Sequence, residues 1–417
     1  MVVDETVGLH HVEFHTKEPQ RLMNIFINTY GFHLSATKTG PNYSQWLLES
    51  YQCRLIISSV SSSMPSNENN FNKDAYDILT TLLTDETTRD LIMNRDTVFN
   101  LGLTVNSVQS ILDRSPDLQV LVSHRRAMDE YGSIDYACIK SSVGNVVHTI
   151  LDMSNYSGLY LPGFIAVVAN SHRNLEFDEA TMSDIDHVAI AVPRGCASST
   201  VSWYERVLGM ARFPINREDD PFQGFLVHVG SMGMRMFAGI YWKCSETGCA
   251  DSSKKLKLVF VESLINENSD ASDQITTFIK NHHGQGGIQH IAFACVDSIK
   301  SAVRITKAKG AAFLTPCLEY YSSENNGRAI EAAGESSNEL SDLGILLDDE
   351  ADNDDVISST SNDTNTSRIL LQIFTKSLFG NDTFFLELIE RRGANGFGSG
   401  NVRTLWKIVQ NHMDRNV

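Results

Sequence analysis

The sequence predicts an α+β fold built from four related β-α-β-β-β modules that pair into two domains. A short strand-like motif with a polar third residue occurs four times, centred on His11, Asn100, His187 and His290. These centres lie 89, 87 and 103 residues apart, which suits one small module per repeat. Each motif is followed by residues at helical spacing and then by runs in which apolar and polar residues alternate.

The predicted helix of each module directly follows its first strand. In three of the four modules the helical pattern ends close to a glycine, a residue that commonly terminates helices. The four helical segments cover residues 21–26, 107–112, 202–208 and 298–303. Alternating runs such as 225–229 and 370–374 then predict the later strands of the modules.

The modules group into an N-terminal domain of residues 1–165 and a C-terminal domain of residues 180–417. Residues 157–163 between them are punctuated by glycine and proline, as is typical of a join. Low-complexity insertions interrupt the modules at residues 61–72 and 322–367. We expect the second insertion to be a solvated, disordered hairpin loop, because closure entropy grows slowly with loop length. An acidic docking element is the alternative.

The negative charge of the protein is concentrated in that insertion. The whole chain has 34 basic and 51 acidic residues, a net charge of −17. Residues 322–367 hold 12 acids against Arg328 alone and account for −11 of it. The acidic balance argues against a nucleic acid or an anionic membrane surface as the main partner.

The remaining composition indicates an ordinary globular protein. Seven scattered cysteines without a C-x-x-C pair support neither a disulfide framework nor a zinc ribbon. We find no 18-residue apolar run and no hydrophobic stretch after a basic start, so we expect no membrane span and no secretory signal. A cytoplasmic location is the expectation, and a mitochondrial one stays open.

Two histidines in equivalent strands are the leading candidates for chemistry. His187 and His290 hold matching positions in the third and fourth modules, so pairing of these modules brings two imidazoles toward one point. A single histidine in an apolar strand is more often a core residue, but a symmetric pair favours a metal site. Glu387 is the third candidate, because a carboxylate in the apolar run 383–389 is costly to bury unpaired. An ion pair of Glu387 with an arginine is the alternative, and Glu262 is a weaker candidate ligand.

Two histidines and one carboxylate with open coordination positions are the ligand set of non-haem Fe(II) oxygenases. Zinc usually takes a fourth protein ligand or a single water. The N-terminal domain has His11 but carries Asn100 at the matching position. We therefore expect Fe(II) in the C-terminal domain and a metal-free, structural N-terminal domain.

These residues sit in a chain that resembles the 4-hydroxyphenylpyruvate dioxygenase family of the vicinal-oxygen-chelate superfamily over nearly its whole length. The run from Leu370 to Asn401 carries the most specific similarity, and shorter matches lie at residues 9–14, 148–149, 160–164, 186–187 and 289–292. The resemblance implies two vicinal-oxygen-chelate (glyoxalase/bleomycin-resistance/dioxygenase-like) domains. It also implies that His187, His290 and Glu387 are the iron ligands.

The resemblance further implies a substrate pocket in which amides orient the carboxylate and phenol of the substrate and phenylalanines wall its ring. Its matching positions are Gln289, Gln372, Phe374 and Asn401 as catalytic residues and Asn266, Gln274 and Phe397 as substrate-binding residues. Three positions depart from the family: Met236 replaces a common serine, Val402 a second ring-stacking phenylalanine and Leu264 a proline. Met236 and Val402 complete the predicted pocket. Such an altered pocket is similar to the divergent 4-hydroxyphenylpyruvate dioxygenase-like branch, associated with 4-hydroxymandelate synthesis in mitochondria.

The activity implied by the resemblance is oxidation of 4-hydroxyphenylpyruvate, or a related aryl 2-oxo acid, by O2 in tyrosine catabolism. Attack on the ring gives homogentisate, and attack on the benzylic carbon gives 4-hydroxymandelate. Extradiol ring cleavage and a non-catalytic small-molecule-binding domain are the rival interpretations. Residues 402–417 have a helical pattern and are expected to cover the site. The sequence leaves a homodimer open.

Overall fold

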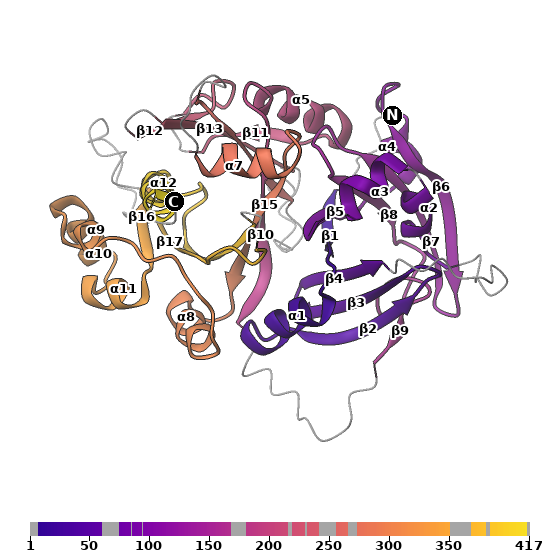
Figure 1. Cartoon of the computed structure of the whole chain (residues 1–417), viewed down its shortest axis with the longest axis horizontal. Helices are drawn as coiled ribbons and strands as arrows, with labels where there is room; N and C mark the ends of the chain where they lie inside the picture. The colour runs from indigo at the N-terminus through magenta and orange to yellow at the C-terminus, as the bar shows by residue number, and fades with distance from the viewer. Residues whose placement is uncertain are drawn as a thin grey trace, which may run out of the picture.

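The computed structural model describes residues 7–60, 75–84, 86–93, 95–167, 181–215, 219–229, 232–241, 256–265, 273–350, 368–380 and 384–414. The insertion predicted at residues 61–72, residues 351–367 and Asn266 lie outside these ranges. The described residues form two nine-stranded sheets, one from β1 to β9 and one from β10 to β18 (Figure 1).

The first sheet has the strand order β6-β7-β8-β5-β1-β4-β3-β2-β9. Its strands are β1 (Gly8–His15), β2 (His33–Thr39), β3 (Tyr43–Ser50), β4 (Cys53–Val60), β5 (Thr97–Thr104), β6 (Val120–Asp129), β7 (Gly132–Lys140), β8 (Val147–Asp152) and β9 (Ile165–Ala166). The accompanying helices are α1 (Pro19–Asn24), which continues as a π-helical turn over Ile25–Thr29, α2 (Leu79–Thr84), α3 (Glu86–Met93) and α4 (Val108–Leu112).

The second sheet has the order β11-β13-β14-β10-β15-β18-β17-β16, with β12 also paired to β13. Its strands are β10 (Met182–Ala191), β11 (Ala211–Phe213), β12 (Phe225–Val229), β13 (Met232–Ile240), β14 (Lys257–Ser263), β15 (Gly287–Cys295), β16 (Leu346–Asp349), β17 (Ile369–Phe374) and β18 (Phe385–Arg392). Its helices are α5 (Ala197–Leu208), α7 (Gln274–Asn281), α8 (Ile299–Ala308), α9 (Leu318–Ser322), α10 (Glu324–Ala332), α11 (Ser337–Leu343) and α12 (Ser399–Asp414).

The strand pairing confirms the prediction of four β-α-β-β-β modules. In every module the first strand pairs in parallel with the last one, as β1 does with β4 and β10 with β14. The first strands of two successive modules then pair antiparallel, β1 with β5 and β10 with β15, which joins modules in twos. The third module differs in one respect, because its second strand is divided into β11 and β12.

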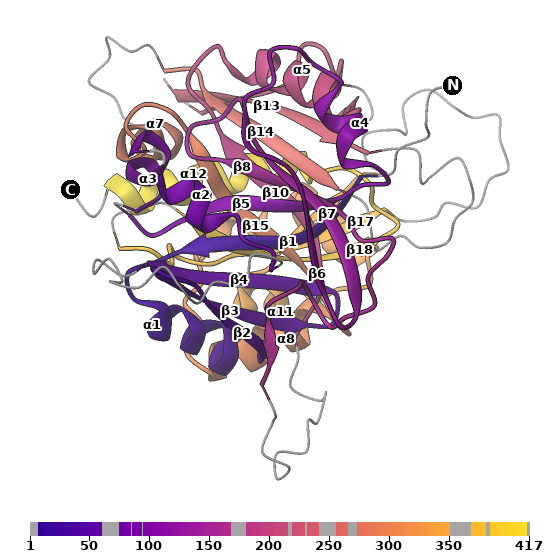
Figure 2. The ribbon, with the colours of Figure 1, turned by 90° about the vertical axis from the view of Figure 1, so that its right-hand side faces the viewer.

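One hydrophobic core runs between the two halves of the molecule and holds them together. Phe14 packs edge-on against Phe384 with ring centroids 5.6 Å apart, and Phe32 packs likewise against Phe293 at 5.9 Å. The hydroxyl of Ser50 donates to the carbonyl of Met182 across the same boundary. Figure 2 shows strands of both sheets lying side by side along this boundary.

Each sheet also has an inner face that helices cover. Leu79 and Leu82 of α2 cover the first sheet. Ile275 and Phe278 of α7, together with Trp406 of α12, cover the second. The second inner face is where the candidate site lies.

The described part of the acidic insertion corrects the expectation of a disordered loop. Residues 324–332 and 337–343 form α10 and α11, and residues 346–349 form an edge strand of the second sheet. The helices form because Ile330, Leu340 and Leu343 are buried in the core. Some acids of this region form local ion pairs, as when Glu335 pairs with Lys300 at 2.8 Å and with Arg392 at 2.7 Å.

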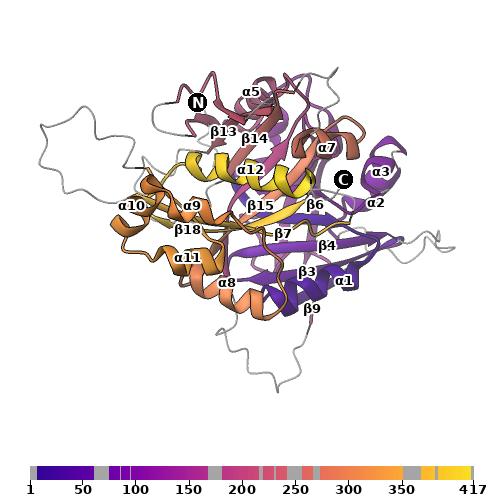
Figure 3. The same cartoon turned by 60° about the vertical axis from the view of Figure 1, so that its left-hand side comes forward.

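The C-terminal helix predicted for residues 402–417 is observed as α12, which begins at Ser399. Figure 3 shows α12 lying across the second sheet, with α7 near one end and α9 and α10 near the other. In the part of the chain that the structure describes, no helix is long and apolar enough to cross a membrane.

Candidate metal centre

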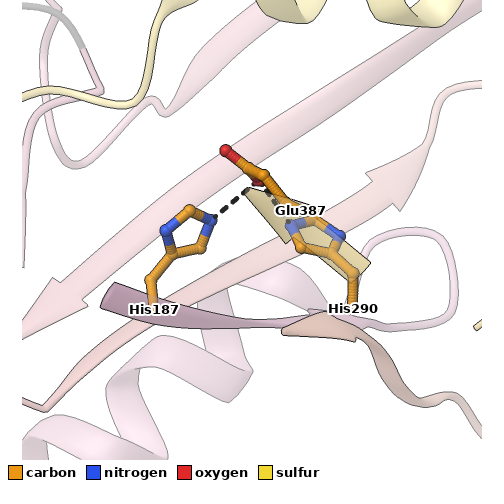
Figure 4. Close-up of side chains that lie close together, drawn as sticks. All are labelled: His187, His290 and Glu387. Atoms are coloured by element: carbon orange, nitrogen blue, oxygen red, sulfur yellow. Dashed lines mark ion pairs between the residues drawn. The ribbon is translucent and has the colours of Figure 1, made fainter. Parts of the chain in front are cut away.

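His187, His290 and Glu387 lie together on the inner face of the second sheet (Figure 4). Their ligating atoms are all within 4.8 Å of one another. Oε2 of Glu387 is 3.5 Å from Nε2 of His187 and 3.5 Å from Nε2 of His290. Among the described residues this is the one group of three such side chains with metal-ligand spacing. The sequence prediction therefore selected three side chains that converge on one point.

The register of three strands explains this convergence. His187 on β10 lies opposite Ala292 on β15, and Glu387 on β18 lies opposite the same alanine from the other side. His290 precedes Ala292 by two residues and therefore points to the same face. It lies opposite Ala189, so small alanine side chains leave the space between the ligands open.

An ion pair behind His187 fixes its orientation. Nδ1 of His187 lies 2.9 Å from Oδ1 of Asp186, which leaves Nε2 directed at Glu387. Arg391 donates two hydrogen bonds to Asp186, at 2.7 and 2.8 Å, and Nη1 of Arg391 donates to the carbonyl of Gly396 at 2.6 Å. Such a carboxylate behind a histidine sets the tautomer and raises the basicity of the ligating nitrogen. The arginine that could have neutralised Glu387 thus pairs with Asp186.

The two histidines have opposite electrostatic surroundings. Burial alone would lower the pKa of His187, but the carboxylates of Glu387 and Asp186 hold it above its ordinary value. Burial, assisted by the nearby His187, lowers the pKa of His290. Burial would raise the pKa of Asp186, but the Arg391 guanidinium holds it well below its usual range. His290 is accordingly a neutral imidazole at neutral pH, and its Nδ1 lies 3.4 Å from the side-chain oxygen of Gln289.

Gln372 and Asn401 hold Glu387 in place. Nε2 of Gln372 donates to Oε1 of Glu387 at 2.7 Å, and Nδ2 of Asn401 donates to Oε1 of Gln372 at 2.8 Å. Both residues are predicted catalytic residues, and in the structure these amide groups contact the carboxylate and each other. Oε2 of Glu387 remains directed at the histidines.

A cavity of about 50 Å³ adjoins the three residues. Its lining contains most of the predicted pocket: Met236, Gln274, Gln289, Gln372, Phe374, Phe397 and Val402. Phe397 packs edge-on against His187 with ring centroids 5.3 Å apart. Asn401 lies outside the lining, and Asn266 is outside the described residues.

Sequence reasoning missed six apolar or aromatic wall residues: Met234, Val259, Val261, Ile275, Phe385 and Leu405. The alternation within β13 and β14 could have found the first three, because Met234 and Met236 share a face, as do Val259 and Val261. Phe385 stacks on His290 with centroids 4.7 Å apart, a contact that no sequence pattern indicated.

Glu262, the weaker candidate ligand, has another role. Its Oε2 accepts a hydrogen bond from the backbone N–H of Ala197 at the start of α5, and its Oε1 pairs with Arg235 at 3.4 Å. Glu262 therefore neutralises a helix N-terminus and an arginine, and it takes no part in the cluster around Glu387.

The cluster suits a divalent transition metal. It offers two imidazole nitrogens whose Nδ1 atoms face side-chain oxygens and one carboxylate oxygen opposite them. Two histidines and a carboxylate are the donor set of mononuclear non-haem iron sites. Oε2 of Glu387 lies 3.5 Å from Nε2 of each imidazole, so a cation among the three would satisfy it.

The fold and this site define a two-domain protein of the vicinal-oxygen-chelate type. Its fold is similar to that of a triple mutant of 4-hydroxymandelate synthase from Streptomyces coelicolor, with a TM-score of 0.70, 21% identity and coverage of 97% of this chain and 98% of that one. No protein-family model matches the chain.

Relatives in sequence narrow this class to one family. The chain is 34% identical to the 4-hydroxyphenylpyruvate dioxygenase-like protein of Rattus norvegicus over 292 residues, 70% of each chain. It is 27% identical to the 4-hydroxyphenylpyruvate dioxygenase of Dictyostelium discoideum over 414 residues, 98% of each. The chain belongs to the 4-hydroxyphenylpyruvate dioxygenase family.

Proposed function

We propose that this protein is an Fe(II)-dependent dioxygenase that converts 4-hydroxyphenylpyruvate to homogentisate, or oxidises a related aryl 2-oxo acid in the same way. The observation that carries this proposal is the convergence of His187, His290 and Glu387 beside an aromatic-walled cavity. The reaction balances as one 4-hydroxyphenylpyruvate and one O2 giving one homogentisate and one CO2. Bound Fe(II) would supply the activation of O2, and the substrate itself would supply the electrons that reduce O2, through its decarboxylation and hydroxylation.

The residues of the chain would orient the substrate and exclude water. Phe374 and Phe397 would flank the aromatic ring of the substrate. The amides of Gln274 and Gln289 would donate hydrogen bonds to the carboxylate and phenol of the substrate. Gln372 would keep one oxygen of Glu387 occupied, so that the other is available as a metal ligand. α12 closes the cavity through Val402 and Leu405 and would shield the reaction from solvent.

Substrate entry requires movement of the cavity walls. A volume of about 50 Å³ holds a few water molecules and is too small for an aryl 2-oxo acid. Met234 and Met236 are unbranched and flexible, so they can repack, and α12 can move away. The site in this structure is therefore its closed form.

A second product, 4-hydroxymandelate, is favoured by one feature of the wall. Val402 lines the cavity at a position where a larger aromatic side chain would restrain the ring of the substrate. With that restraint removed, the benzylic carbon rather than the ring could face the oxidant.

Product analysis tests both proposals. Metal-free protein is loaded with Fe(II) without oxygen, mixed with 4-hydroxyphenylpyruvate and exposed to O2, and the aromatic product is identified by mass spectrometry. Homogentisate supports the first proposal, and 4-hydroxymandelate supports the second. Failure to bind iron, or oxygen uptake without an aromatic product, contradicts both and favours a non-catalytic binding protein.

A further inference from the structure

A chain of buried hydrogen bonds extends from Glu387 to Tyr320, on the side away from the histidines. Glu387 accepts from Gln372 at 2.7 Å, Gln372 accepts from Asn401 at 2.8 Å, and Oδ1 of Asn401 lies 3.1 Å from the hydroxyl of Tyr320. All four side chains are less than 9% exposed. We propose that Tyr320 is a positioning residue for Glu387, acting through Asn401 and Gln372, and that this chain couples the docking of α12 to order at the metal site.

The carboxylate at one end dictates the direction of every hydrogen bond. An ionised Glu387 can only accept, so Gln372 must present its NH2 group to it. The oxygen of Gln372 then faces Asn401, which must present its own NH2 group. Oδ1 of Asn401 is thereby turned toward Tyr320 and needs a donor, and the Tyr320 hydroxyl is the donor at that place.

The hydroxyl of Tyr320 has one proton and two acceptors within reach. The carbonyl of Leu347 lies at 2.7 Å and Oδ1 of Asn401 at 3.1 Å, while the N–H of Leu347 donates to the same hydroxyl at 3.0 Å. Tyr320 therefore has a structural contact to β16 in addition to its contact with Asn401. A test must separate these two roles.

The chain of hydrogen bonds connects residues on four elements that are far apart in sequence. Tyr320 is on α9, Asn401 on α12, Gln372 on β17 and Glu387 on β18. Asn401 is fully buried, in the same first turn of α12 that carries Val402 into the cavity wall. When α12 is docked, Asn401 donates a hydrogen bond to Gln372. When α12 moves away, Gln372 loses this hydrogen bond. Closure of the site and fixation of Glu387 thus occur together.

The adjacent tyrosine supplies a matched control. Tyr321 is as buried as Tyr320, at 5% against 8% exposed, but its hydroxyl has no hydrogen-bond partner among the residues that the structure describes. Tyr321→Phe therefore removes the same atom from the same helix without breaking a bond. The two substitutions differ only in the hydrogen bonds of Tyr320.

The inference rests on the proposed function, and its test uses the metal alone. The metal-free full-length protein is titrated with Co(II) without oxygen, the visible d–d absorption bands report binding, and urea unfolding without metal reports stability. We expect Tyr320→Phe to weaken Co(II) binding by about three- to tenfold and Tyr321→Phe to leave it unchanged, since loss of a direct partner of a ligand typically costs about 10- to 100-fold. Asn401→Asp, which removes the donor to Gln372, should weaken binding at least as much.

The outcomes separate the inference from the proposed function. If wild-type protein binds no Co(II), the metal site itself is wrong and both proposals fail. If wild-type protein binds Co(II) and Tyr320→Phe lowers only the urea midpoint, Tyr320 is a structural residue and the inference is overturned while the metal site stands. Equal weakening by both tyrosine substitutions overturns the inference in the same way. If Tyr320→Phe does not fold, Asn401→Asp decides, and unchanged Co(II) affinity in that variant contradicts the coupling.

Discussion

The inner faces of the two sheets have the same geometry and opposite chemistry. The pairing registers align His11 with His187, Asn100 with His290 and Thr149 with Glu387. Only the second set directs metal-binding atoms at a common point. The difference between the two faces shows what turns this scaffold into a site.

The first sheet closes its inner face with hydrogen bonds among its own side chains. Glu13 holds the position that Ala189 holds in the second sheet. Its carboxylate accepts hydrogen bonds from Gln45, Ser58 and Asn100 at 2.6 to 2.8 Å. Burial raises the pKa of Glu13 despite these donors. The amide of Asn100 is further occupied by Thr149.

The histidine of the first sheet is also occupied. A Cβ on Gly102 would lie 2.1 Å from the ring of His11, so the imidazole fills the space beside that glycine. Burial lowers the pKa of His11 to about 3, and its Nδ1 lies 2.8 Å from Nδ1 of His10. In the second sheet an alanine takes the place of Gly102, and Nε2 of His187 is directed at Glu387.

The largest effect is expected when the second sheet is given a residue of the first. His290→Asn places the equivalent of Asn100 among the ligands and removes one imidazole nitrogen. We expect Fe(II) affinity to fall by at least about 100-fold, beyond the range for indirect partners of a ligand. Equilibrium dialysis without oxygen measures it. His228→Asn is the control, because it makes the same chemical change at an exposed position of β12 and should leave the Fe(II) affinity unchanged. Equal iron binding by both variants would contradict the assignment of His290 as a ligand.

The second prediction concerns the closed network of the first sheet. Glu13→Ala leaves the buried donors of Gln45, Ser58 and Asn100 without their common acceptor. We expect the free energy of unfolding to fall by roughly 3 to 5 kcal/mol, because each orphaned donor costs about 1–3 kcal/mol and partial relaxation recovers some of this. Urea denaturation measures the loss. Iron stoichiometry in the folded protein should not change, and a loss of iron here would mean that the two faces are not independent.

The third prediction tests the ion pair behind His187. Asp186→Asn weakens the contact to Nδ1 and releases Arg391, so Fe(II) affinity should fall by about 10- to 100-fold. Asp135→Asn is the matched control, since Asp135 receives a similar two-bond contact from Arg126 on the surface of the first sheet. Isothermal titration calorimetry without oxygen compares the two variants. Equal affinities would show that Asp186 does not orient the ligand.

The smallest effect is a pH dependence carried by His148 of the first sheet. Burial lowers its pKa to about 4, and it hydrogen-bonds Tyr204 of the second half at 2.9 Å. The unfolded state therefore binds more protons between the ordinary pKa of about 6.5 and about 4, so stability falls as the pH falls through this window. From pH 7 to pH 5 His148 should contribute about 2 kcal/mol of that loss.

Urea midpoints at pH 7 and pH 5 check this expectation. His148→Gln should show a smaller fall than wild-type protein, whereas His33→Gln, at an exposed strand position, should show the same fall as wild type. A fall that is unchanged in His148→Gln would mean that other groups carry the acid sensitivity.

Much of the fold and the centre of the site could be predicted from sequence. The repeated strand motif gave the modules because strand periodicity is local and each module repeats it. Symmetry then placed His187 and His290 together without knowledge of any contact. Glu387 followed because a carboxylate in an apolar strand needs a partner.

The rest depended on contacts between distant segments. The hydrogen bonds of Gln372 and Asn401 could not be predicted because nothing local shows that one amide faces Glu387 and the other faces Tyr320. The ordered helices α10 and α11 were missed because the high density of acids hid the helical spacing of Ile330, Leu340 and Leu343. The partnership of Asp186 with Arg391 joins residues 205 positions apart, beyond any sequence pattern.

Iron stoichiometry in three proteins tests the central claim most directly. Wild-type protein, Glu387→Ala and the register-equivalent Thr149→Ala are equilibrated with excess Fe(II) without oxygen, dialysed and assayed for iron per chain. One iron in wild type, none in Glu387→Ala and one in Thr149→Ala is the predicted result. Two irons per chain in wild type, or one retained in Glu387→Ala, would contradict the assignment of a single metal centre to the second sheet.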